Sequence, residues 1–313
     1  MLITHPEKPL FPADGITKGD LAGYYEAVAP VMLPHVRGRP VTQERFPNGI
    51  GAKGFLQKNV EKGFPDFLRR VEAPKSDGVV NYPLIEDTRS LLWMANQNCI
   101  TPHVWTARAP ELYQPDICVV DLDPPDDDPA ALRMAVLAVR DALGDLGLPS
   151  WVKTSGSKGY HVVVPLDAQL GYDEVAAFAL AVGTLLVKNH PDRLTQEFSI
   201  ADRRGRIFVD TGRNGYSATF AAPYAVRARP GAPVSAPCRW EEIEGGTVHP
   251  RSFALRTMAA RLDTVGDLWS DLLQNPQSLA EPIARIAEQV SPAELRESEL
   301  ARRRRPKPRS AIA

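Results

Sequence analysis

An apolar strand that ends in two aspartates is the sequence feature that most limits the fold. The segment ICVVDLD, residues 117–123, is rich in β-branched residues and stops at Pro124 and Pro125, so it predicts a buried strand. Alternation along a strand places Asp121 and Asp123 on the same face. Because unpaired buried carboxylates are costly, the fold must supply them with a positive partner, and a metal ion is the natural one.

Composition excludes several classes of protein. Of the 313 residues, 43% are hydrophobic and 24% are charged, and the formal net charge is −1, so the chain can bury a core. Its longest nearly apolar stretch, residues 175–187, is shorter than the ~18 to 20 residues that cross a bilayer. The N-terminus has no apolar signal region, and the three cysteines show no CxxC spacing. We therefore expect a cytoplasmic protein that does not contact a membrane.

Charge is unevenly distributed along the chain. Residues 76–150 hold the acidic excess, centred on DLDPPDDDP, whereas the C-terminal segment 302–313 carries basic residues and no acidic one. Such a basic run is typical of a solvated, disordered tail, and it can also hold nucleic acid through phosphate contacts.

Hydrophobic periodicity predicts one α/β domain built around a mixed sheet, with a helical C-terminal part. Residues 41–76 mix short apolar pieces with glycine, lysine and phenylalanine, which indicates strands and loops. The expected helices span about 18–33, 87–97, 129–147 and 172–189, with mainly helical structure over 254–290, and the further expected strands are 151–154, 160–166 and 206–211.

The turn SGSKG, residues 155–159, joins two of these strands. Its backbone amides, the hydroxyls of Ser155 and Ser157, and the charge of Lys158 suit an anion such as phosphate, although a plain hairpin turn would also have this sequence. His161 follows on the next strand and is expected near the same turn.

A third carboxylate, Asp210, ends the apolar strand IFVD. With Asp121 and Asp123 it could hold divalent cations, or all three could simply cap turns. Arg227 and Arg229 share one side of an extended segment and suit polyphosphate. Carboxylates for metals beside cations for phosphates are typical of two-metal phosphoryl chemistry.

The motifs DLDPP, TSGSKGYHVVVPL, IFVD with RN shortly after, and APYAVRARPGAPVSAP resemble, in this order and spacing, the polymerase domain of bacterial ligase D. This is the end-joining member of the archaeo-eukaryotic primase superfamily. The resemblance runs from about Glu7 to Trp240. It implies a primase-polymerase fold of mixed and antiparallel sheet flanked by helices, and addition of nucleotides, with ribonucleotides preferred, to primer 3′ ends at DNA breaks or short gaps. It also implies a bacterial, nucleoid-associated protein.

The resemblance assigns roles at matched positions. Two Mn²⁺ or Mg²⁺ ions would bind the three aspartates, and Asp210 would also help to activate the primer 3′ hydroxyl. Two departures, Leu56 and Thr211, replace aromatic residues that are frequent in the family. The remaining roles are nucleotide binding by His103, Ser155, Lys158, His161, Arg203, Arg227 and Arg229, binding of a DNA 5′-phosphate by Lys8 and Lys18, and stacking on template bases by Phe55.

The resemblance also implies an organisation and partners. We expect a single domain over residues 1–290, with a DNA-end-binding part at about 1–75, a catalytic core at about 76–255 and a helical region at about 256–290. Residues 291–313 would form a basic, disordered tail. As a stand-alone form the protein would act on DNA and nucleoside triphosphates, beside Ku and a separate ATP-dependent DNA ligase.

Three alternatives stay open at this point. A stand-alone primase-polymerase could fill gaps in excision repair instead of joining breaks. A haloacid-dehalogenase phosphatase also has a strand ending in DxD, with Asp121 as nucleophile and Asp123 as acid, but Pro125 departs from its pattern. A DNA-end-bridging module without chemistry would keep Lys8 and Lys18, yet all three candidate metal carboxylates are present.

Overall fold

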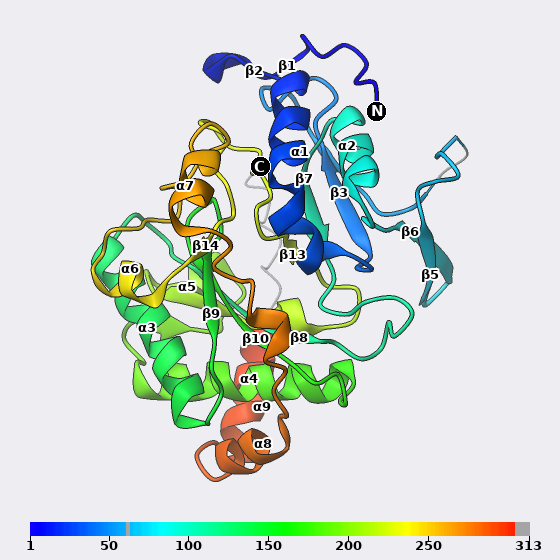
Figure 1. Cartoon of the computed structure of the whole chain (residues 1–313). Coiled ribbons are helices and arrows are strands. Elements are labelled where there is room, and N and C mark those ends of the chain that lie inside the picture. Colours follow the sequence, from blue (N-terminus) through cyan, green and yellow to red (C-terminus); the bar gives the residue numbers. More distant parts are fainter. Residues whose placement is uncertain (61–62, 304–313) are drawn as a thin grey trace, which may run out of the picture.

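Two β-sheets form the frame of the computed structural model, which describes residues 1–60 and 63–303 (Figure 1). The larger sheet has six strands in the order β11-β12-β8-β10-β9-β14, and all neighbours are antiparallel except β11 and β12. The mixed α/β architecture with antiparallel sheets flanked by helices agrees with the predicted fold class. The strands are β8 Ile117–Asp123, β9 Trp151–Thr154, β10 Tyr160–Pro165, β11 Leu194–Thr195, β12 Ile207–Asp210 and β14 Pro237–Cys238.

A second sheet of four strands, in the order β13-β7-β3-β4, covers one face of the first. Alternation along β8 explains the sandwich: Val119 packs in a core shared with β7 of the second sheet, whereas Val120 packs in a separate core beneath helices. The sequence predicted one sheet, and the second arises because both faces of β8 are apolar. Its strands are β3 Val41–Arg45, β4 Phe55–Gln57, β7 Cys99–Val104 and β13 Phe220–Ala221.

Helices cover the outer face of the six-stranded sheet. The two long ones are α3, Pro129–Asp145, and α4, Tyr172–Asn189, as the sequence predicted (Figure 1). Helix α3 begins at a cap in which Asp128 Oδ1 accepts from the backbone amides of Ala130 and Ala131, with Pro129 in the first turn. Shorter helices in the same part of the chain are α5 Ile200–Arg203, η2 Gly212–Asn214 and α6 Trp240–Glu244.

The N-terminal part packs against the smaller sheet. Helix α1, Lys18–Val36, begins with a capping box between Thr17 and Asp20, and it continues through Pro34 beyond the predicted end. Burial of Leu33 and Val36 in the core offsets the cost of this proline. The other elements are β1 Pro9–Phe11, η1 Pro12–Asp14, β2 Ile16–Thr17, α2 Thr88–Asn96, and the hairpin of β5 Arg70–Lys75 with β6 Gly78–Pro83.

The C-terminal part is more ordered than the sequence indicated. The expected disordered tail from residue 291 is wrong over its first half, because residues 292–303 form helix α9, Pro292–Arg303. The side chains of Ser291 and Glu294 cap each other's backbone amides, a local signal that the basic run obscured. Residues 304–313 lie outside the described part. Residues 254–290 hold α7 Met258–Val265, η3 Leu272–Gln274 and α8 Ala280–Ala287.

Among the described residues, no helix has the length and apolar character needed to cross a membrane.

Candidate functional site

One row of side chains crosses four strands of the six-stranded sheet. Antiparallel pairing puts Asp121 opposite Asp210 on one side and opposite His161 on the other, and His161 is opposite Lys153. Residues directly opposite on one face lie about 4.5 to 5.5 Å apart at Cβ. The register therefore brings together two of the predicted carboxylates, and it places the histidine and a lysine beside them.

Arg213 lies between the two carboxylates of this row. Its Nε is 3.2 Å from Oδ2 of Asp121, and its Nη2 is 3.2 Å from Oδ2 of Asp210. Asp123, which is more exposed, has its own partner in Arg203, with Nη1 3.5 Å from Oδ2. Each predicted metal ligand is thus paired with a guanidinium.

Burial and these pairings set the charges in the row. Burial raises the pKa of Asp210, and neighbouring Asp121 adds to the rise against the pull of Arg213. Burial also opposes ionisation of Asp121, but His161 and Arg213 outweigh it and hold the pKa well below its usual range. Burial, and then Lys153, lower the pKa of His161 to about 4, so the imidazole is neutral at pH 7.

The donor set fits a hard divalent cation. Carboxylate oxygens are the ligands that Mg²⁺ and Mn²⁺ prefer, and Asp121 and Asp210 both direct an oxygen at the same cation, the guanidinium of Arg213. Within residues 1–60 and 63–303, no three His, Cys, Asp or Glu side chains already converge around one point. An ion would therefore replace Arg213 between these carboxylates, and Asp123 would have to turn from Arg203 to join them.

The glycine turn after β9 is held by hydrogen bonds to the side chain of Ser155. Oγ of Ser155 accepts hydrogen bonds from the backbone amides of Ser157 (3.2 Å) and Gly159 (3.1 Å). Gly156 has a φ of 64°, and a Cβ there would lie 2.6 Å from Cγ of Arg227, so only glycine fits. Arg227 Nη1 donates to the carbonyl of Ser155 at 2.6 Å, which joins the two predicted phosphate contacts.

Two buried atoms at this site suit a ligand. Nε of Arg227 and Nδ1 of His161 have no hydrogen-bond partner among the described residues. Because buried polar groups are normally paired, each marks a place where a bound molecule would supply the missing partner.

His103 approaches from the other sheet. It lies on β7, and its Nε2 is 3.2 Å from Oε2 of Glu44 on the neighbouring β3. Burial lowers the pKa of His103 and the charge of Arg227 lowers it further, while Glu44 opposes both. The same Arg227 also lowers the pKa of Glu44. Arg227 is thus close enough to interact with groups of both sheets.

The other predicted residues lie around this centre. Lys158 is exposed at the tip of the turn, and Arg229 is exposed two residues beyond Arg227. Arg203 is mostly buried over the ring of Phe208, 4.1 Å from its centroid, and donates to backbone carbonyls, so it is held by the protein itself. Phe55 is exposed on the edge strand β4 with Arg45 over its ring.

Lys8 and Lys18 form a separate pair at the N-terminus. The amide of Lys18 donates to the carbonyl of Lys8 at 2.8 Å, and Lys18 is the first residue of α1. Burial lowers the pKa of Lys18, and the charge of Lys8 lowers it further. The two lysines that the resemblance predicts to bind a 5′-phosphate thus lie together at the N-terminus of α1, with Nζ of Lys18 donating to Oγ1 of Thr4 at 3.4 Å and to the carbonyl of Asn96 at 3.3 Å.

Three further residues belong to this centre and were not predicted as site residues. Lys153 is fully buried, and its Nζ donates to Oγ of Ser235. Symmetric pairing about the turn SGSKG would have placed it opposite His161. Arg213 and Asn214 are the RN pair of the quoted motif, to which the resemblance assigned no role. Asn214 bonds both backbone groups of Val119 and so ties the turn after Asp210 to β8.

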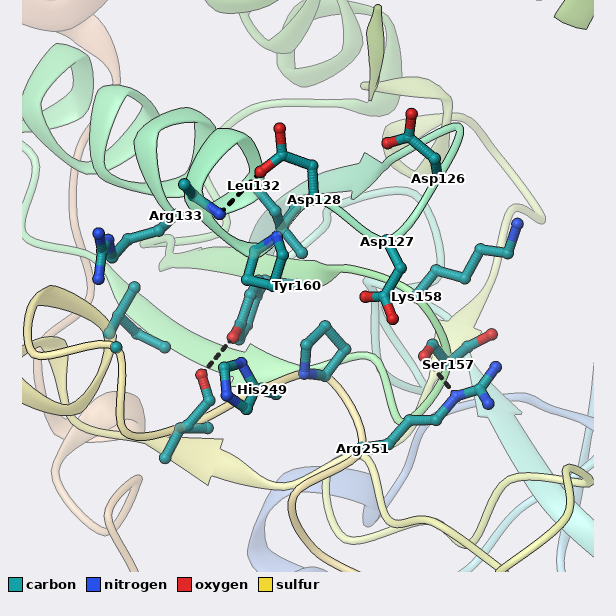
Figure 2. Close-up of a pocket in the computed structure, with 16 residues that line it drawn as sticks. Asp126, Asp127, Asp128, Leu132, Arg133, Ser157, Lys158, Tyr160, His249 and Arg251 are labelled. Carbon is teal, nitrogen blue, oxygen red and sulfur yellow. Dashed lines mark hydrogen bonds between the residues drawn. The ribbon is translucent and has the colours of Figure 1, made fainter. Parts of the chain in front are cut away.

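A cavity of about 830 Å³ lies behind the glycine turn (Figure 2). Tyr160 lines it, and Tyr160 points to the face of β10 opposite to His161, so the cavity is on the α3 side and away from the carboxylate row. Figure 2 shows Asp127, Lys158 and Arg251 around it, with Nε of Arg251 donating to the carbonyl of Ser157 at 2.9 Å.

The chain is similar to known proteins over most of its length. Residues 17–269 match the family model for the LigD primase-polymerase domain. A multifunctional non-homologous end joining protein LigD from Mycolicibacterium smegmatis is 34% identical over 86% of this chain and 36% of its own length, and a bifunctional LigD from Bacillus subtilis is 30% identical over 92% and 46%. The chain thus spans about a third to a half of these relatives.

A solved structure matches the fold as well. The polymerase domain of Mycobacterium tuberculosis ligase D, in complex with DNA, superposes with a TM-score of 0.83 at 34% identity, covering 88% of this chain and 99% of that one. Family model, sequence relatives and solved structure therefore agree: the chain belongs to the LigD primase-polymerase domain family, a family of nucleotidyltransferases.

Proposed function

We propose that the protein is a template-dependent repair polymerase that adds nucleotides, with ribonucleotides preferred, to primer 3′ ends at DNA breaks or short gaps carrying a 5′-phosphate. The observation that carries this proposal is the side-by-side placement of Asp121 and Asp210 next to the glycine turn, in a chain of this family. Non-homologous end joining is the process named in the relatives.

Different side chains of the row would act on the two reactants, the primer 3′ end and the incoming nucleotide. Asp121, Asp123 and Asp210 would hold two Mn²⁺ or Mg²⁺ ions, which polarise the phosphoryl group and stabilise the attacking and leaving oxygens. Asp210, at the end of β12, would accept or orient the proton of the primer hydroxyl. Neutral His161 has Nε2 3.4 Å from Oδ1 of Asp121, so its unpartnered Nδ1 would accept a hydrogen bond from the incoming nucleotide.

The phosphates of the nucleotide would bind at the glycine turn. The hydroxyl of Ser155, which is fixed by two amides of the turn, the exposed Lys158 and the unpartnered Nε of Arg227 would supply donors and positive charge. His103 and the exposed Arg229 would contact the same nucleotide from the opposite sheet and the turn's outer side. Phe55 would stack on a template base, and Lys8 with Lys18 would bind the 5′-phosphate across the gap.

Extension of a labelled primer on gapped DNA tests the proposal. Reactions would contain Mn²⁺ or Mg²⁺ and either ribonucleotides or deoxyribonucleotides, on DNA with and without a downstream 5′-phosphate. We expect templated addition that is strongest with ribonucleotides and the 5′-phosphate, and that Lys8→Gln with Lys18→Gln abolishes the response to the phosphate. Tight DNA binding without any addition would favour an end-bridging role.

A role in gap-filling repair is distinguished from end joining by whether the reaction requires Ku and a ligase. Joining of linear ends that requires added Ku and an ATP-dependent ligase would support end joining. Efficient filling of a one-nucleotide gap that is indifferent to Ku would support excision repair instead.

A further inference from the structure

Helix α9 ends beside the third carboxylate of the site. The helix is fixed to α4 by Lys188, whose Nζ lies 3.0 Å from Oε1 of Glu294, and its last turn accepts a hydrogen bond from the amide of Phe198 at the carbonyl of Ala301, 3.4 Å away. A Cβ built on Gly212 would lie 3.0 Å from Oδ1 of Asp210 and 3.2 Å from Nη2 of Arg302. The carboxylate and this guanidinium thus meet over the same glycine.

This contact lies outside the region that the family model matches, which ends at residue 269. Since α9 begins at residue 292, Arg302 lies in a part of the chain that the family model does not describe.

The carboxylates near Arg302 are already paired with other arginines. Asp121 and Asp210 already share Arg213, and Asp123 has Arg203. Among the described residues Arg302 itself forms no hydrogen bond or ion pair, although it is half-buried. Divalent cations at the same carboxylates would add positive charge, so the guanidinium would then be repelled from them and would favour a negatively charged ligand.

Strand order indicates which ligand this is. The glycine turn joins β9 and β10, which lie on one side of β8, whereas Asp210 and Arg302 lie on the other side, at β12. The triphosphate would occupy the first side, so a phosphate on the second side belongs to the other reactant. Resting on the proposed function, we propose that Arg302 binds a backbone phosphate of the primer strand close to its 3′ end.

The test compares two arginines of the same helix turn. Arg302→Gln removes the proposed contact, and Arg303→Gln removes an equal charge from a side chain that is 75% exposed and pairs with Glu299 at 2.6 Å. Binding of a fluorescent primer-template is measured by anisotropy over a range of salt, with Ca²⁺ present and no nucleotide. We expect Arg302→Gln to weaken binding roughly three- to tenfold and to reduce the salt slope by about 1, and Arg303→Gln to stay within about twofold of wild type.

Two further measurements test the role of Arg302. One distinguishes its charge from its packing, and the other distinguishes binding of the primer from binding of the nucleotide. Arg302→Lys keeps the charge and should recover most of the affinity, whereas a structural role in the last turn would leave lysine and glutamine equally affected. In extension assays Arg302→Gln should raise the KM for primer-template and leave the KM for nucleotide unchanged. A change confined to the nucleotide KM would overturn the assignment to the primer strand.

The remaining outcomes are decisive as well. Faster extension with unchanged or tighter DNA binding in Arg302→Gln would show that the guanidinium blocks the site, and equal effects of the two glutamine variants would show only a general charge effect. Either result overturns the proposal. Because the binding arm needs no catalysis, loss of extension in the wild type would count against the proposed function and not against this contact.

Discussion

Five aspartates within eight residues fall into two groups that the fold treats in opposite ways. Asp121 and Asp123 end β8 and are paired with arginines, and Asp121 also lies in a row with Asp210 on the face between the two sheets. Asp126, Asp127 and Asp128 are exposed in the loop that follows, on the side of the cavity behind the glycine turn. Local acid density therefore does not identify the candidate metal site, whereas strand register and pairing do.

The division of the aspartates into two groups is tested most directly by neutralising one aspartate of each group. Asp121→Asn keeps the shape but removes a metal-ligand charge, so nucleotide incorporation should fall by at least ~10²-fold, because a metal at such a site contributes several kcal/mol to the transition state. Asp126→Asn should change incorporation less than about twofold, as a solvated loop charge does. Single-nucleotide incorporation under saturating Mn²⁺ measures both.

Equal losses in the two variants would contradict the division into groups. Loss of folding in Asp121→Asn would be detected by circular dichroism, and Asp210→Asn would then provide the independent variant of the first group.

Metal binding to the free protein should show the same division. An ion that binds only the folded state stabilises it by about 2.7 kcal/mol at 100 times its Kd. We expect Mn²⁺ to raise the Tm of the wild type and of an Asp126→Asn, Asp127→Asn variant. An Asp121→Asn, Asp210→Asn variant should show no rise, and a rise equal to wild type would place the ion elsewhere.

Arg213 gives a further test of this division, since the first group depends on its guanidinium as a counter-charge. Its side chain is 41% exposed, so losing its pairs in Arg213→Gln should lower the free energy of unfolding by about 1 to 2 kcal/mol in EDTA, less than for a fully buried pair. Arg204→Gln removes an exposed arginine nearby and should have little effect.

Mn²⁺ should restore the free energy of unfolding that Arg213→Gln loses, because a cation between Asp121 and Asp210 replaces the missing charge. Urea unfolding with and without Mn²⁺ measures this. A loss that is the same in EDTA and in saturating Mn²⁺ would mean that Arg213 acts by packing and not as the counter-charge.

The sequence predicted the elements that carry local signals and missed those fixed by long-range contacts. β-Branched strands, the glycine turn and the caps of α1 and α3 all gave patterns visible within a few residues. The second sheet and the position of Arg302 depend on packing between segments that are far apart in the chain, which leaves no local periodicity. Helix α9 was missed because its basic C-terminal residues suggested a solvated tail, although its cap was legible.

The candidate site was predictable to a similar extent. Lys153 and His161 could be related by pairing the two strands across the turn SGSKG. The pairings of Asp121 with His161 and with Asp210 could not, because α3 lies between β8 and β10, and β12 joins β8 from the other side after a long helical crossover. Resemblance to the family supplied that grouping, and the strand register now explains it.

The smallest expected effect concerns Asp128, the loop aspartate with a structural task. Its Oδ1 accepts hydrogen bonds from the amides of Ala130 and Ala131, both 3.0 Å away, so it caps α3. Asp128→Ala should lower the free energy of unfolding by about 1 kcal/mol, and Asp128→Asn should restore it, because asparagine caps as well as aspartate. Incorporation per folded molecule should be unchanged in both. A metal-binding role for this loop would instead reduce incorporation in Asp128→Asn while leaving its stability intact, which would erase the distinction between the two groups.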